Sequence, residues 1–74
     1  YKYGFRTKLI MLWTDVNEIA IDLYENHPDT DPTYILFTDL RDMVVALNNF
    51  QDDPNKSNEK ILETIQMLWI EERD

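Results

Sequence analysis

The feature that most constrains the fold of this chain is an apolar stripe of helical spacing that recurs three times. Apolar side chains three and four residues apart lie on one face of a helix. Two breaks, around residues 28–32 and 52–55, separate the stripes and contain Pro28, Pro32 and Pro54. Proline cannot donate a hydrogen bond within a helix, so helices end there. Because each stripe can be buried only against the others, the sequence predicts an all-α fold, a small three-helix bundle.

The first stripe follows Trp13, and Thr14 or Asp15 is its expected N-cap. Asp15 and Glu18 also have the spacing of a capping box. The apolar positions of this stripe are Val16, Ile19, Ala20, Leu23 and Tyr24. After the first break, the β-prone run over residues 33–37 predicts either one short strand or an extended linker.

The second helix is expected to start at Thr38 or Asp39, and Ser57 or Asn58 is expected to cap the third. The second stripe consists of Leu40, Met43, Val44 and Leu47, with Phe50 closing that end. The third consists of Ile61, Leu62, Ile65, Leu68 and Trp69. Trp13 and Trp69 are interpreted as core residues.

Charge divides the chain into a basic segment, residues 1–11, and one acidic domain, residues 12–74. The segment holds Lys2, Arg6 and Lys8 and no acid, whereas all 15 acids follow it and the net charge is −8. We consider three origins for the segment: an expression remnant, the end of a transit peptide, or a true extension. A strongly acidic domain disfavours nucleic acid as a partner, and no apolar run is long enough to cross a bilayer.

Four acids of the first helix form the main candidate site. Asp15, Glu18, Asp22 and Glu25 fall within an arc of about 80°, and the predicted first helix contains no lysine or arginine. Asp29 and Asp31 extend this acidic stripe beyond the helix. One interpretation is a solvated helix face; the other is a docking surface for a basic protein or a weak site for hard cations.

Signals for an enzyme are poor, and we predict a protein without catalytic activity. His27 is the only histidine and there is no cysteine, so His27 before proline is interpreted as a cap or surface residue. The spacing of Asp53, Asn55 and Ser57 suggests the start of an EF-hand loop. That motif fails, because the positions that require Gly and Glu hold Asn and Thr.

A series of short motifs runs through the acidic domain: Trp13-Thr14-Asp15, Leu23-Tyr24, Pro28-Asp29-x-Asp31-Pro32, Phe37-Thr38-Asp39, Phe50 and Trp69-x-x-Glu72. The most specific stretch is Asp-Asp-Pro at residues 52–54, followed by Ser-Asn-Glu-Lys-Ile-Leu-Glu at residues 57–63. With these motifs, the sequence from residue 12 to the end resembles the IscX (YfhJ) family of small acidic iron–sulphur cluster assembly proteins.

The resemblance implies a winged-helix-like helical domain that binds the cysteine desulfurase of the assembly machinery and regulates it. It also implies competition with frataxin, ferredoxin as a further partner, and weak surface binding of Fe²⁺ or Fe³⁺ without a tightly bound cofactor. The implied partner-binding residues are Asp15, Glu18, Asp22, Glu25, Asp29 and Asp31. The implied metal-binding residues are Asp22, Glu25, Asp29, Asp31, Asp39, Asp52 and Asp53.

Asn48, Asn49 and Gln51 depart from the family, which is typically acidic there, so iron binding beside Asp52 and Asp53 is less expected than at the first helix. An iron chaperone is the alternative function. A DNA-binding winged helix is disfavoured, because the second helix offers only Arg41 and the third Lys60. We expect a monomer in the bacterial cytoplasm, or in the mitochondrial matrix if residues 1–11 descend from a transit peptide.

Overall fold

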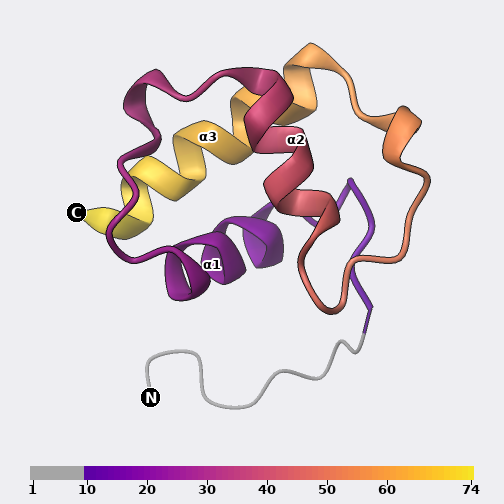
Figure 1. Ribbon diagram of the computed structural model, residues 1–74, viewed down its shortest axis with the longest axis horizontal. Helices are drawn as coiled ribbons and strands as arrows, with labels where there is room; N and C mark the ends of the chain where they lie inside the picture. The colour runs from indigo at the N-terminus through magenta and orange to yellow at the C-terminus, as the bar shows by residue number, and fades with distance from the viewer. Residues whose placement is uncertain (1–9) are drawn as a thin grey trace.

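Three helices form in the order in which the three apolar stripes occur. The computed structural model describes residues 10–74, and Figure 1 shows their arrangement: α1 is Val16–Asn26, α2 is Phe37–Val45 and α3 is Glu59–Arg73. Two 3₁₀ turns, η1 (Pro32–Tyr34) and η2 (Pro54–Lys56), occupy the proline-containing breaks. Across residues 10–74 no strand is present, so the all-α prediction is confirmed.

The core lies where the three stripes meet, with α3 packed along α1. Trp13 and Trp69 are 1% and 0% exposed, which confirms their interpretation as core residues. The other members of the core are Met11, Ile19, Ala20, Leu23, Leu40, Val44, Leu47, Phe50, Leu62 and Ile65. No helix within residues 10–74 has the length and apolar character needed to cross a membrane.

The helix starts agree only in part with the sequence. Asp15 is the N-cap residue of α1, but its side chain makes no cap bond and instead accepts a hydrogen bond from Leu12 N at 2.8 Å. Asn58 caps α3 as expected, since its Oδ1 accepts from Ile61 N at 2.8 Å. The expected start of α2 at Thr38 or Asp39 is wrong, because the helix begins at Phe37 with Leu36 at the N-cap position and no side-chain cap bond.

The β-prone run over residues 33–37 forms no strand. Its first part belongs to η1, where the side chain of Asp31 accepts a hydrogen bond from Thr33 N. Ile35 and Leu36 then have extended backbone angles before α2 begins. Of the two alternatives, the extended linker is therefore the one that forms, over these two residues.

The segment before α1 is held against the turn that follows α2. Met11 N donates to Asn49 O at 2.7 Å and Gln51 N donates to Met11 O at 3.0 Å, forming a single parallel bridge between Met11 and Phe50. Met11 is 2% exposed, so the packed domain includes this last residue of the segment set apart by charge.

Candidate functional site

The N-cap acid and the three acids of α1 do not form one exposed row. Glu25 is exposed, Asp15 and Glu18 are partly buried, and Asp22 is only 8% exposed. The helical arc placed Asp22 beside the apolar face, and in the structure the whole run Ile19–Leu23 is buried. Because a partner could touch little of Asp22, the acidic surface that α1 presents is concentrated at its last turn.

The loop after α1 continues this acidic surface with Asp29 and Asp31, which are both exposed. The carboxylate of Asp31 accepts hydrogen bonds from Thr33 Oγ1 at 2.7 Å and Thr33 N at 3.0 Å. These bonds, with a smaller contribution from the charge of Arg73, lower the pKa of Asp31 below its ordinary value. Asp31 therefore keeps its negative charge in mildly acidic solution.

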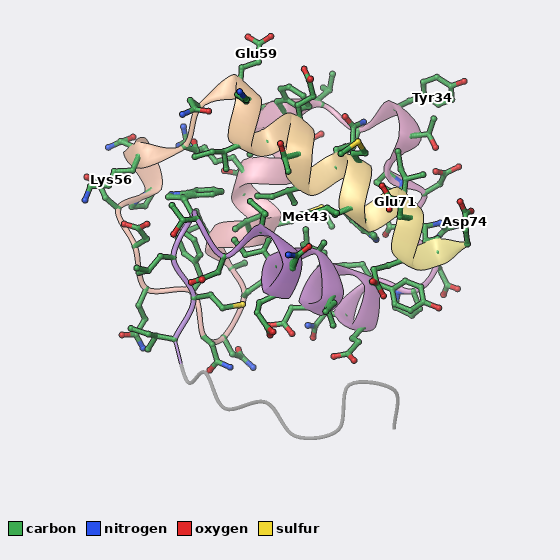
Figure 2. All side chains as sticks on the ribbon, turned by 180° about the vertical axis from the view of Figure 1, so that it is seen from behind. Tyr34, Met43, Lys56, Glu59, Glu71 and Asp74 are labelled. Carbon is green, nitrogen blue, oxygen red and sulfur yellow. The ribbon has the colours of Figure 1, made fainter. Side chains whose placement is uncertain are left out.

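Arg73, near the end of α3, fixes this loop. Its Nη1 donates to Thr30 O at 2.7 Å and to Pro28 O at 3.2 Å. These bonds bring the C-terminal end of α3 to the loop that follows α1, and Figure 2 shows Glu71 and Asp74 at that end of the molecule. We call the exposed acids there the acidic end: Glu25, Asp29, Asp31, Glu71 and Asp74.

The acids of the second break have a structural role. Asp52 accepts hydrogen bonds from Trp13 N at 3.0 Å and from Asp53 N at 2.7 Å, which lower its pKa. Asp53 accepts from Asn55 N at 2.9 Å through its side chain, and its backbone oxygen accepts from Trp13 Nε1 at 2.8 Å. These two acids therefore clamp Trp13 into the core across about forty residues of chain.

The acids expected to bind metal are not gathered into one centre. Within the part of the chain that the structure describes, no group of three or more acidic or histidine side chains could together hold a metal ion. Asp39 lies in the first turn of α2, and Asp52 and Asp53 belong to the Trp13 clamp. Binding at any one of these positions would be exposed and shared with water, which makes it weak.

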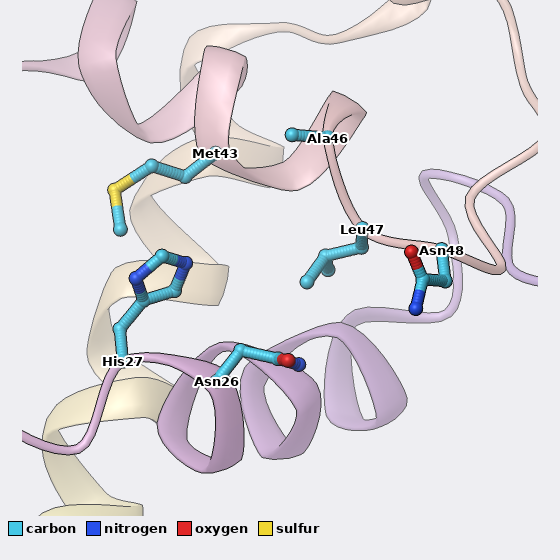
Figure 3. A pocket seen from close by; sticks show the side chains of 6 residues that line it. All are labelled: Asn26, His27, Met43, Ala46, Leu47 and Asn48. Atoms are coloured by element: carbon cyan, nitrogen blue, oxygen red, sulfur yellow. The ribbon is translucent and has the colours of Figure 1, made fainter.

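A pocket of about 250 Å³ lies between the end of α1 and α2, and Figure 3 shows His27 and Met43 on its wall. The remaining lining residues are Asn26, Ala46, Leu47 and Asn48. His27 is the C-cap residue of α1, as the sequence indicated, and its ring lies 6.4 Å from that of Trp69. Among these lining residues, His27 is the one with a titratable side chain.

Two features of the surface were missed at the level of sequence. Arg73 carried no motif, because its partners are backbone oxygens more than forty residues away. Among residues 10–74, five large apolar side chains are also exposed, and the three most exposed are Tyr34 at 91%, Leu36 at 66% and Met67 at 53%. The only signal for the first two was their place in the run that was predicted as a strand or an extended linker.

The similarity to known proteins extends over the residues that form the packed domain. Residues 11–74 match the family model described as iron–sulphur cluster assembly. The chain is also similar to the uncharacterized protein PA3808 of Pseudomonas aeruginosa, with 61% identity over 62 residues, which cover 84% of this chain and 94% of that relative. The match begins at Met11, which is the first buried core residue within residues 10–74.

Proposed function

The chain belongs to the IscX (YfhJ) family of iron–sulphur cluster assembly proteins, and we propose that it acts there as a non-catalytic adaptor of the cysteine desulfurase. In this proposal the acidic end binds a basic surface near the active site of the desulfurase. The bound domain regulates sulphur transfer by occupying a surface that substrate, scaffold or frataxin would otherwise reach.

One observation carries the proposal, namely the collection of exposed acids at the acidic end. Glu25, Asp29 and Asp31 come from one stretch of chain, and Arg73 holds their loop against the end of α3. Because the loop is tied by hydrogen bonds, its charges are presented in a fixed arrangement and a partner need not order them on binding. A fixed acidic surface increases the rate of encounter with a basic partner, and salt weakens that effect.

Competition with frataxin, which the family resemblance implies, is part of the proposal, because two proteins cannot occupy one basic surface at once. Ferredoxin is a further partner within the proposal. We expect the domain to act as a monomer in the bacterial cytoplasm, with the mitochondrial matrix as the alternative setting.

Iron binding is a secondary part of the proposal. We expect Fe²⁺ or Fe³⁺ to bind weakly and at the surface, because no three acidic side chains of the described residues form a common site. The acidic side chains at positions 31, 52 and 53 are already acceptors of hydrogen bonds within the fold. This distribution favours an adaptor over an iron chaperone, which would need affinity high enough to hold iron during transfer.

The test is binding of the full chain to a purified cysteine desulfurase by interferometry at low and high salt. Reversing Glu25 and Asp29 to lysine is expected to weaken binding roughly tenfold or more at low salt. Asp22 is left unchanged, because a lysine at a position that is 8% exposed would disturb the core.

The matched control reverses Asp42 and Glu59, which are exposed, lie outside the acidic end and change the net charge by the same amount. Glu59 begins α3, about 20 Å from the end of that helix. The control is expected to bind within about threefold of the wild type. Equal losses for the two variants would show that only net charge matters, and unchanged binding of the Glu25 and Asp29 variant would refute the assignment of the surface.

A further inference from the structure

Three exposed apolar side chains form a second feature next to the acidic end, and we name Tyr34, Leu36 and Met67 the apolar patch. Tyr34 is 91% exposed, and Figure 2 shows it at the same end of the molecule as Glu71 and Asp74. Where large exposed apolar side chains gather on a small monomeric domain, they mark interaction sites.

Hydrogen bonds between η1 and α3 hold together the two elements that carry Tyr34 and Met67. Gln66 Nε2 donates to Pro32 O at 2.8 Å and to Thr33 O at 3.1 Å. Tyr34 directly follows this contact on η1, and Met67 directly follows Gln66 on α3. The patch therefore lies on a fixed part of the surface.

The direction of Leu36 is set by the extended linker before α2. Successive side chains of an extended segment point to opposite sides. Ile35 is partly buried and packs against the core, so Leu36 points outward. The backbone therefore explains why the side chain at position 36 is exposed. It does not explain why that side chain is apolar, because a polar residue would fit the same backbone.

Acids surround the patch. Glu63 and Glu71 lie four residues before and after Met67 on α3, one turn away on either side, and both are exposed. Asp31 precedes Tyr34 by three residues and keeps its charge. Of the neighbouring cations, Arg73 is bound to the loop carbonyls and Lys60 lies two turns before Met67.

We propose that the apolar patch is the anchor of the interface with the desulfurase and inserts into an apolar recess whose rim carries lysine or arginine. This inference rests on the proposed function and adds a second contact to it. A rim of opposite charge matches the acids around the patch, and aromatic and methionine side chains are typical centres of such interfaces.

The two surfaces then have different kinetic roles. The acidic end accelerates encounter and so sets the association rate constant and its salt dependence. The patch is desolvated only in the final complex and so sets the dissociation rate constant. Asp31 links the two surfaces, because it belongs to the acidic end and borders the apolar patch.

The experiment measures association and dissociation rate constants of the full chain with the purified desulfurase. The variant carries Tyr34→Ser and Leu36→Ser, both at exposed positions, and circular dichroism verifies that it folds. We expect dissociation to be faster by roughly tenfold or more, with association within about twofold of the wild type and the salt dependence retained. Leu12→Ser, at an exposed apolar position outside the patch, is the matched control for Leu36→Ser and should leave both rate constants unchanged.

The outcomes separate the two proposals. If the wild type fails to bind at low salt, the proposed function fails and this inference with it. If charge reversal at Glu25 and Asp29 weakens binding but the patch variant dissociates like the wild type, only the patch assignment is overturned. Sedimentation of the chain alone tests a second copy as the occupant, and a dimer that the patch variant abolishes would also overturn the proposal.

Discussion

The two buried tryptophans differ in one hydrogen bond, and this difference predicts unequal effects of the same substitution. Trp13 Nε1 donates to Asp53 O at 2.8 Å, whereas Trp69 Nε1 is buried and has no hydrogen-bond partner among residues 10–74. Both side chains are almost completely buried, at 1% and 0% exposed. Replacing each with phenylalanine removes the same atoms from the core, so the loss of packing is similar in the two variants.

The polar contributions have opposite signs. Trp13→Phe loses a hydrogen bond worth about 1 kcal/mol. Trp69→Phe removes a buried N–H group whose unsatisfied state costs about 1–3 kcal/mol. The free energy of unfolding of Trp13→Phe should therefore be lower than that of Trp69→Phe by about 2 kcal/mol or more. The edge-to-face contact of Trp13 with Phe50, at 4.8 Å between ring centroids, can persist with phenylalanine and does not remove the difference.

Urea unfolding followed by far-ultraviolet circular dichroism measures this difference, because the helix signal does not depend on tryptophan fluorescence. With a slope of about 1 kcal/mol per molar urea for a small domain, the two midpoints should differ by about 2 M. If the free energy of unfolding falls with urea at the same slope in both variants, the difference between their midpoints reports stability alone. If Trp69→Phe were as destabilising as Trp13→Phe, the different hydrogen bonding of the two indole N–H groups would not affect the free energy of unfolding, and the reasoning would be refuted.

Two further predictions concern the acid that holds Trp13 and the cap of α3. The hydrogen bonds from Trp13 N and Asp53 N lower the pKa of Asp52 below 3.8, so its contribution to stability is present at neutral pH and is lost as the pH falls through the lowered value. Asp52→Asn should be less stable at pH 7 and should lose this part of the acid dependence; an unchanged pH profile of the urea midpoint would contradict the role of Asp52. Asn58→Ala should lower the free energy of unfolding by about 1 kcal/mol, whereas Ser57→Ala should change it by less than about 0.5 kcal/mol. The reverse order in urea unfolding would assign the cap to Ser57.

Local chemistry predicted much of the fold. The periodic apolar residues located all three helices, because the core face of a helix repeats with the helix itself. Asn58 was one of two predicted caps for α3, and its bond to Ile61 N depends only on residues three apart. The start of α2 was predicted wrongly because Thr38 and Asp39 are good capping residues, yet the helix begins at Phe37, which packs against the core. Packing there outweighs capping preference.

The candidate site was less predictable because it depends on contacts that are distant in the sequence. A helical arc describes one helix, and it cannot say that Asp22 is covered by the rest of the bundle. The acids of the second break matched family motifs, but their bonds to Trp13 span 39 and 40 residues. Arg73 reaches carbonyl groups that no side-chain pattern reveals. Such contacts follow from the packing of the whole domain.

The clamp on Trp13 also has a consequence for synthesis of the chain on the ribosome. Trp13 is synthesised early. Asp53, whose backbone oxygen accepts the hydrogen bond from the indole N–H of Trp13, is made forty residues later. At about 5–20 residues per second, translation of that interval takes roughly 2–8 s. Throughout that time a large apolar ring that ends in the core has no completed site to enter. The core is completed later still, because Leu62, Ile65 and Trp69 of α3 belong to it.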